Sequence, residues 1–195
     1  MLPLANKQIA MLVAQEYEDI ELLYPLLRLS EEGATIFVVA VPMGHHPRPY
    51  LENKPVTGRF GHPVPIPVMP PGKHYQMAKL EDLRADELDG LLLPGGFSPD
   101  YLRRNSHVLD LVRSCYNQGK IIAAICHAPW VLISAGIVKG KRMTGVVAVR
   151  DDLINAGAIY LDEPVVRDGN LITSRKPDDL PLFCRTIIEA FSQPS

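Results

Sequence analysis

The sequence predicts an α/β fold with a mainly parallel central sheet and helices on both faces. Short apolar runs without a polar interruption recur along the chain, as is typical of strands covered on both faces. Between these runs, apolar residues recur at helical spacing. The length of 195 residues, 47% of them hydrophobic, suits one domain with a full core over residues 1–195.

The chain opens with a strand, a helix and a second strand. Residues 8–14 form the first apolar run and residues 34–41 the second. Between them, residues 18–32 carry leucine and isoleucine at helical spacing, and Gly33 follows as a helix-ending signal. A unit of this length implies a parallel strand pair with a right-handed crossover.

The remaining elements continue this alternation. We expect further strands at residues 88–94, 121–125 and 140–149, and further helices at residues 106–118, 128–135, 151–156 and 178–191. Near the end of the chain, residues 165–167 and 171–174 flank Asp168-Gly169-Asn170, which is typical hairpin-turn chemistry. A small antiparallel hairpin is therefore expected beside the parallel sheet.

One segment, at about residues 42–74, does not fit the pattern. Nine of the 18 prolines lie within residues 42–71. We interpret the segment as an irregular surface excursion, with a lid or an oligomer contact as the alternatives, and residues 54–68 could form a short exposed hairpin. His45 and His46 are adjacent, so on an extended chain they point apart, and no metal site is expected from them.

Composition excludes several function classes. The net charge is −2, without a basic patch that would indicate nucleic acid or an anionic membrane surface. No apolar run approaches the roughly 18 residues of a membrane span, and no secretory signal pattern is present, so we expect a cytoplasmic protein. Three widely spaced cysteines match neither a disulfide framework nor a zinc pattern. We expect reduced thiols and no cofactor.

The stretch that organises the chain is the apolar run at residues 121–125, followed by Cys126. Pro129 suits the first turn of a helix, so Cys126 is placed at a strand-to-helix turn on the carboxyl edge of the sheet. That is the usual ligand position in α/β folds, and a helix N-terminus favours a thiolate. The alternative is an inert cysteine that packs as a small hydrophobic residue.

Two further strand ends carry groups that could act with Cys126. Glu18 follows the first strand, and Gly95-Gly96 directly follows the strand at residues 88–94, where backbone N–H groups could approach an oxyanion. His127 is the last of the six histidines, so it is the candidate base, or else a structural hydrogen-bonding residue. Glu18 could instead be part of an acidic first helical turn.

Several motifs resemble the PfpI branch of the ThiJ/PfpI superfamily. They are EYEDIELLYPLLRLSEEGA, LLLPGGFSPDYLR, AAICHAPWVLISAGIVKGK and the C-terminal RDDLINAGAIY with VVRDGNLITSRKPDDLP. The resemblance implies a flavodoxin-like three-layer sandwich with a nucleophilic cysteine, Cys126, on a strained nucleophile elbow. It further implies that Glu18 contacts Cys126 and that Asp100 reaches His127 of a neighbouring subunit in a homo-oligomer, a dimer or higher.

Four positions around the expected pocket depart from the family pattern. The elbow of the family commonly reads C-H-G-P-Q, whereas Ala128 and Trp130 stand here. Val146 replaces part of a common tyrosine-proline pair, and Phe97 replaces a residue that is often polar or basic. Of these residues, the apolar Val146, Phe97 and Trp130 suggest a cramped pocket and favour a small substrate.

We therefore expect a cysteine-dependent enzyme that attacks a small carbonyl compound. The resemblance implies either glyoxalase-type conversion of 2-oxoaldehydes or a PfpI-like peptidase or hydrolase activity on peptides. The alternative from another class is a stress-response or redox-sensing protein with an oxidisable Cys126 and little turnover. A third alternative is a structural or chaperone-like oligomer, in which Cys126 has no chemical role.

Overall fold

The computed structural model describes residues 2–42 and 48–192, and its centre is a seven-stranded sheet with strand order β3-β2-β1-β4-β5-β9-β8. The strands are β1 (Gln8–Val13), β2 (Thr35–Ala40), β3 (Gln76–Met77), β4 (Gly90–Leu93), β5 (Ile121–Ile125), β8 (Val165–Asp168) and β9 (Leu171–Ser174). All neighbouring pairs are parallel except β8 with β9. The predicted mainly parallel sheet and its antiparallel hairpin are confirmed.

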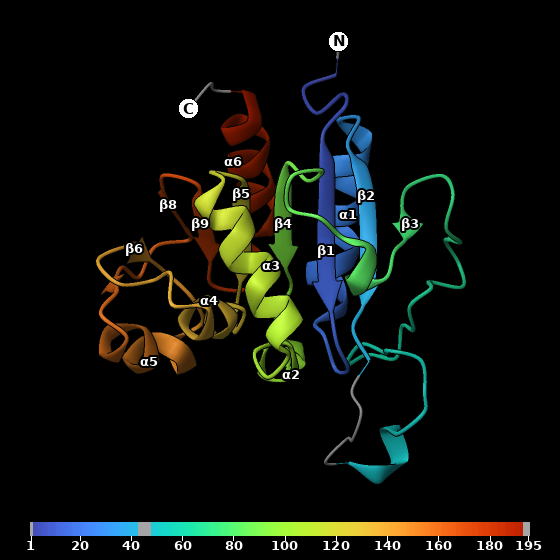
Figure 1. The fold of residues 1–195 in the computed structure, drawn as a ribbon, viewed down its shortest axis with the longest axis horizontal. Helices are drawn as coiled ribbons and strands as arrows, with labels where there is room; N and C mark the ends of the chain where they lie inside the picture. Colours follow the sequence, from blue (N-terminus) through green and yellow to red (C-terminus); the bar gives the residue numbers. More distant parts are fainter. Residues whose placement is uncertain (1, 43–47, 193–195) are drawn as a thin grey trace.

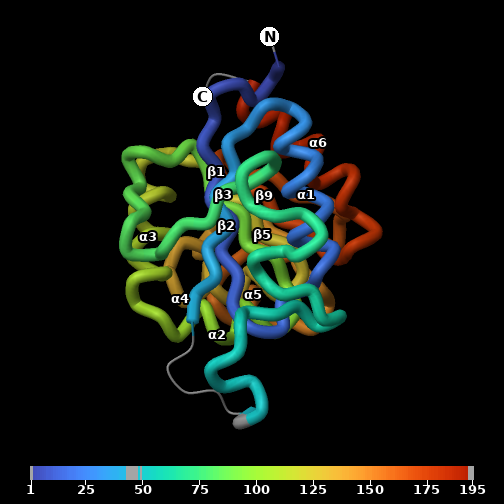
Figure 2. The backbone as a smooth tube through the Cα atoms, turned by 90° about the vertical axis from the view of Figure 1, so that its right-hand side faces the viewer, coloured from blue at the N-terminus to red at the C-terminus, as the bar shows by residue number. Residues whose placement is uncertain are grey.

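Helices cover both faces of this sheet, as Figures 1 and 2 show. On one face lie α1 (Asp19–Glu31) and α6 (Leu180–Ser192), which pack against each other; on the other lie α2 (Ser98–Leu102), α3 (Ser106–Asn117), α4 (Pro129–Ala135) and α5 (Arg150–Asn155). Each helical layer shares a separate apolar cluster with the sheet. The three-layer arrangement is therefore as the sequence predicts.

Strand β1 shows why uninterrupted apolar runs mark the centre of such a sheet. Ala10 and Leu12 belong to the cluster on the α3 side, whereas Ile9, Met11 and Val13 belong to the cluster on the α1 side. Successive side chains of a strand point to opposite faces, so both faces of β1 are buried only if every position is apolar.

The predicted strand at 140–149 is largely wrong. Only β6 (Arg142–Met143) is extended, and it pairs in parallel with β7 (Ile159–Tyr160) in a separate two-stranded sheet. Beyond β6 the chain turns toward the end of β5, where the Val146 N–H donates to the Cys126 carbonyl at 3.0 Å, and Val147–Val149 forms a 3₁₀ turn. Contact with the cysteine turn therefore replaces sheet pairing.

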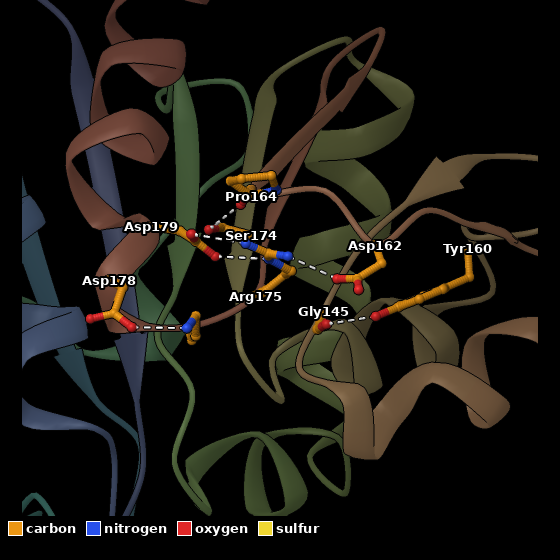
Figure 3. Close-up of polar contacts among 9 residues, drawn as sticks. Gly145, Tyr160, Asp162, Pro164, Ser174, Arg175, Asp178 and Asp179 are labelled. Carbon is orange, nitrogen blue, oxygen red and sulfur yellow. Dashed lines mark hydrogen bonds and ion pairs between the residues drawn. The ribbon is translucent and has the colours of Figure 1, made fainter.

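A polar cluster fixes the carboxyl end of β9, the strand beside β5 (Figure 3). The Arg175 guanidinium contacts Asp162 at 2.8 Å and Asp179 at 3.0 Å, and the Ser174 hydroxyl donates to the Pro164 carbonyl at 2.8 Å. These contacts tie the chain before β8 to the start of α6. They hold in place the Ser174 carbonyl, which accepts the Cys126 N–H at 3.0 Å.

The Pro-rich excursion lies between β2 and β3, and its described part begins at residue 48. Val56, Val64 and Ile66 are buried in the apolar cluster that also contains α1, so the segment packs on the core. An isolated antiparallel bridge joins Thr57 to Pro63, and the Val64 N–H donates to the Val56 carbonyl at 2.8 Å. The segment therefore turns back on itself as the suggested hairpin would, but without a regular strand and with Val56 and Val64 buried. His45 and His46 lie outside the described residues.

No helix in the described part of the chain is long and apolar enough to cross a membrane.

Candidate active site

Cys126 occupies the turn between β5 and α4, as predicted. Its φ of +65° lies in the left-handed region, which costs a non-glycine residue energy and is typical of a nucleophile elbow. Its N–H donates to the Ser174 carbonyl at the end of β9, and its carbonyl accepts the Val146 N–H from the segment after β6. These two hydrogen bonds hold the strained backbone of the turn. The side chain is partly exposed, whereas Cys115 and Cys184 are buried.

The imidazole of His127 lies directly beside the thiol. The Cys126 Sγ and His127 Nδ1 atoms are 3.2 Å apart, within hydrogen-bond distance for sulfur. Burial, and secondly the positive charge of Arg59, lower the pKa of His127. The imidazole is therefore neutral at pH 7 and able to accept a proton. Within the described part of this single chain, no carboxylate hydrogen-bonds to its ring.

The carboxyl group beside Cys126 belongs to Glu21, and the prediction that Glu18 contacts the thiol is wrong for this structure. Glu21 is fully buried, and its Oε2 accepts the Gly95 N–H at 2.7 Å. A Cβ placed on Gly95 would lie 2.6 Å from Cys126 Cβ and 2.7 Å from Glu21 Oε2, so these groups surround the same point. The Glu21 carboxyl is close enough to interact with the thiol itself.

Glu18 and Glu21 differ because α1 begins between them. Glu18 is the extended residue before the helix, with ψ of 111°, and its carboxylate pairs with Arg59 Nη1 at 3.1 Å. Glu21 lies three residues later, within the first helical turn, where its side chain reaches the ends of β4 and β5. The signal available in the sequence was this i, i+3 relation.

Burial shifts the acidic groups of the site toward their protonated forms. It raises the pKa of Glu21 to about 8, so this carboxyl is protonated at neutral pH. The pKa of the Cys126 thiol is also raised, by burial first and then by the negative charge that Glu21 carries when ionised. The expected lowering of this pKa by the helix N-terminus is therefore not found. A protonated Glu21 removes the second contribution and offers a hydrogen-bond donor to a thiolate.

Backbone donors around the sulfur come from Gly96 and His127. Their N–H groups hydrogen-bond to Cys126 Sγ and lower its pKa, in opposition to burial. Gly95, which was expected to share this role, donates its N–H to Glu21. Gly95 instead provides space, because any side chain there would collide with Cys126 and Glu21.

Asp100 is on α2 and forms an ion pair with Arg104, two residues beyond the end of that helix. Asp100 has no contact with His127 within the chain. Its action on a neighbouring subunit stays a prediction.

The four expected pocket residues have different surroundings. Phe97 is half exposed, under the guanidinium of Arg48 at 5.5 Å, and Trp130 stacks at a tilt on His127 with ring centroids 5.1 Å apart. Val146 is partly buried next to the Cys126 backbone. Ala128, in contrast, is completely buried in the cluster on the α3 side with φ of −59°, so its methyl group packs in the core.

The Pro-rich excursion also reaches the site, and the arginines through which it does so were not predicted from the sequence. Arg48 pairs with Glu16, whose other carboxylate oxygen accepts the Tyr101 hydroxyl at 2.9 Å. Arg59 pairs with Glu18. Both arginines are therefore held against the turn that follows β1. Among the described residues, no group of three or more His, Cys, Asp or Glu side chains could hold a metal ion.

The mainly parallel sheet has a strained cysteine turn at its carboxyl edge and a buried carboxyl group beside the cysteine. These features define an α/β protein with a cysteine at an elbow-type strand-to-helix turn. The sequence matches the model of the DJ-1/PfpI family over residues 7–190, and the chain belongs to this family.

Relatives and a solved structure agree with this membership. The chain is 36% identical to "Deglycase PfpI" of Pyrococcus furiosus, over 93% of this chain and 98% of the relative. It is 39% identical to "Putative cysteine protease YraA" of Bacillus subtilis, over 92% and 95%. The crystal structure of Drosophila melanogaster DJ-1beta aligns with a TM-score of 0.75 and 28% identity, over 96% of this chain and 91% of that one.

Proposed function

We propose that this protein is a cysteine-dependent enzyme that converts small 2-oxoaldehydes, or their adducts, to 2-hydroxy acids. The observation that carries the proposal is the arrangement at the elbow: the Cys126 sulfur contacts a neutral imidazole, two backbone N–H groups and a buried carboxyl group. A nucleophile, a base and hydrogen-bond donors for a developing oxyanion therefore surround the place that the carbonyl carbon of a substrate would occupy.

The reaction begins when His127 takes the thiol proton and Cys126 Sγ bonds to the aldehyde carbon. The resulting hemithioacetal oxygen faces the N–H groups of Gly96 and His127. His127 returns the thiol proton to this oxygen and then, neutral again, moves the proton of the former aldehyde carbon to the neighbouring carbonyl carbon. The hydroxyl proton passes to the oxygen of that second carbon, which leaves a thioester of the 2-hydroxy acid. Water hydrolyses the thioester and restores the thiol. The conversion is redox-neutral, with one water consumed.

The protonated Glu21 holds the sulfur without competing for its charge. A carboxylate at this position would repel the thiolate, whereas a protonated carboxyl group donates a hydrogen bond to it. The pKa of Glu21, about 8, supports this role at neutral pH. Asp100 of a second copy would orient the His127 ring, which lacks a carboxylate partner within the described single chain.

Two features favour a small carbonyl substrate over a peptide. The aromatic ring of Trp130 packs against His127, and Val146 adds apolar bulk next to the Cys126 backbone. The name of the Pyrococcus furiosus relative is deglycase, which is consistent with chemistry on carbonyl adducts. The cysteine protease name of the Bacillus subtilis relative makes peptide hydrolysis the competing reaction.

The decisive experiment is incubation with methylglyoxal and quantification of lactate, with Cys126→Ala as the matched variant. We expect lactate from the wild-type protein and a loss of at least about 100-fold in the variant, as nucleophile removal does in covalent catalysis. A fluorogenic peptide is assayed in parallel. Equal lactate formation by both proteins, or turnover of the peptide alone, contradicts the proposal.

A redox role for Cys126 is the second candidate, because it is partly exposed whereas the other two cysteines are buried. A protonated Glu21 could donate a hydrogen bond to an oxygen of sulfinic acid formed there. Intact-mass analysis after mild peroxide treatment would show two added oxygens confined to Cys126. Such oxidation without methylglyoxal turnover would favour sensing over catalysis.

A further inference from the structure

The excursion holds Arg59 against the turn that follows β1, beside the Cys126 site. Its backbone N–H donates to the Tyr17 carbonyl at 2.9 Å, and its Nη1 lies 3.1 Å from Glu18 Oε2. The next residue, Phe60, donates its N–H to Asp19 Oδ2 at 2.9 Å. Contacts on both sides of Arg59 therefore fix the backbone from which its side chain extends.

The partner of Arg59 lies directly next to the reacting groups. The Glu18 N–H donates to the Gly95 carbonyl at 3.2 Å, and Gly95 adjoins Cys126. The charge of Arg59 is felt by two site residues, because it contributes to lowering the pKa of His127 and opposes the rise in the pKa of Glu21. The guanidinium therefore lies within electrostatic range of a substrate bound at Cys126.

The guanidinium also retains capacity to bind a ligand. The Arg59 side chain is 47% exposed, whereas that of Glu18 beneath it is 11% exposed. Among the described residues, Nη1 alone of its nitrogens donates a hydrogen bond, and the Phe60 ring lies 5.8 Å from the guanidinium carbon. A guanidinium has five N–H donors in a planar fork that matches a carboxylate. The ion pair with Glu18 leaves most of them for an incoming anion.

Stability alone is a weak reason for this arrangement. An ion pair with one half-exposed partner contributes about 0–1 kcal/mol. The ion pair instead fixes the Arg59 guanidinium next to Glu18, whose backbone is bonded to Gly95 beside Cys126, and this gives Glu18 a positioning role.

We propose that Arg59 is a specificity-determining residue that binds a carboxylate on the substrate, so that the preferred 2-oxoaldehydes carry a negative charge at the end opposite the aldehyde. This inference deepens the proposed function and rests on it for the identity of the reaction. The chemical class is a 2-oxoaldehyde with a terminal carboxylate, such as 4,5-dioxopentanoate. Its neutral analogue with the same number of carbons is 2-oxopentanal.

The first test does not depend on turnover. Cys126 is alkylated with iodoacetate, which is anionic, and separately with iodoacetamide, which is neutral and of similar size; in both reactions the sulfur bonds to carbon and iodide leaves. Intact mass gives the two rates. Cys115 and Cys184 are buried, and Cys126→Ala reports any background. We expect Arg59→Gln to lower the iodoacetate-to-iodoacetamide rate ratio about tenfold, the size of one nearby charge at a partly exposed site.

Two variants make this ratio interpretable. Arg59→Lys keeps the charge and should restore part of the ratio. Arg84→Gln removes an exposed arginine that is paired with Asp86 on the surface, and should leave the ratio at the wild-type value. If Arg59→Gln and Arg84→Gln give the same ratio as wild type, the anion subsite is overturned, whatever the reaction of the enzyme.

The second test compares kcat/KM for 4,5-dioxopentanoate and 2-oxopentanal in the wild-type protein, Arg59→Gln, Arg59→Lys and Arg84→Gln. We expect Arg59→Gln to lower the ratio of the two constants about tenfold through the KM of the anionic substrate. Effects common to both substrates cancel in the ratio. If the wild-type protein turns over neither compound, the proposed function fails while the alkylation ratio still decides the subsite. An unchanged ratio with active proteins overturns the specificity proposal alone.

Discussion

Two strand-to-helix turns meet at the candidate site, and they build it in different ways. The turn after β5 is tight: Cys126 is the first residue beyond the strand, and α4 begins three residues later. The turn after β1 is longer, because five residues separate Val13 from Asp19, the first residue of α1. Both contain a non-glycine residue with positive φ, Cys126 at +65° and Glu16 at +59°.

The comparison of the two turns shows when the sequence position of a residue is enough to predict its place in the site. At a tight turn, the residue after the strand is necessarily at the sheet edge. At a longer turn, the side chain that returns to the edge is chosen by helical phase, so Glu21 reaches Gly95 while Glu18 points to the excursion. A motif alignment that counts residues without this phase selects the wrong glutamate.

The largest expected effect comes from filling the space between the two turns. Gly95→Ala would place a Cβ 2.6 Å from Cys126 Cβ and 2.7 Å from Glu21 Oε2, so one of them must move. We expect a loss of turnover of at least about 100-fold, since displacement by about 1 Å is enough to disrupt a catalytic geometry. Kinetics on methylglyoxal measure it.

Gly119→Ala is the matched control for this prediction. Gly119 precedes β5 at the opposite end of the strand and has open space around it, with φ of +72°. The added methyl should cost about 1 kcal/mol of stability through backbone strain and leave kcat/KM near the wild-type value. Turnover by Gly95→Ala within fivefold of this control would show that the two turns do not depend on close contact.

The second prediction separates the two glutamates. Glu21→Leu removes the donor to the sulfur and leaves the Gly95 N–H without its acceptor, so we expect kcat/KM to fall about 100-fold, roughly 3 kcal/mol at 1.4 kcal/mol per tenfold. Glu18→Leu should reduce it by less than about fivefold for a neutral substrate. Steady-state kinetics on methylglyoxal compare them, with thermal unfolding to verify folding.

Glu21→Gln adds an internal check, because its amide can both donate and accept. It should retain turnover to within about fivefold at pH 7 if Glu21 acts in its protonated form. A larger loss in Glu18→Leu than in Glu21→Leu would reverse the assignment that the structure makes.

Much of the fold was predictable because buried parallel strands leave an unambiguous pattern. The runs at 121–125 and 8–14 correspond to β5 and β1, and Cys126 was placed at its turn. The prediction of a strand at 140–149 was wrong because the Val146 N–H donates to the Cys126 carbonyl. This contact joins segments that are distant in sequence, and no local pattern encodes it.

The candidate site was predictable only for residues adjacent to strand ends. Cys126 and His127 are the first two residues after β5 and Gly96 is the third after β4, so the pairing of these strands brings them together. Arg59 comes from the Pro-rich excursion, whose irregular backbone has no periodicity to indicate where it packs. The predicted contact of Asp100 with His127 of a second copy stays a prediction, because local sequence patterns do not place one chain against another.

The third prediction concerns stability against pH. The pKa of Glu21 is raised from 4.5 to about 8 in the folded protein, so folding favours the protonated form. Its contribution is fully present below pH 4.5, declines as pH rises toward 8, and is constant above that. Glu21→Gln does not titrate. Its free energy of unfolding, relative to wild type, should therefore rise by about 3 to 5 kcal/mol between pH 5 and pH 8.5, at about 1.4 kcal/mol per pKa unit.

Urea unfolding at the two pH values measures this difference. Glu18→Gln is the control, and its free energy relative to wild type should change by less than about 1 kcal/mol over the same range. Parallel behaviour of the two variants would mean that the β1 turn does not hold Glu21 in a distinct buried environment.

The smallest expected effect is on the far side of the elbow, at Ala128. Its methyl group is completely buried against the α3 layer, and its φ of −59° requires no glycine. Ala128→Gly, which restores the common family motif, should cost about 1 kcal/mol of stability through lost packing and greater freedom of the unfolded chain. Because the methyl points into the core, kcat/KM for methylglyoxal should stay within about twofold of wild type. An increase of tenfold or more would show that Ala128 restricts the pocket, and that the elbow alone does not account for substrate size.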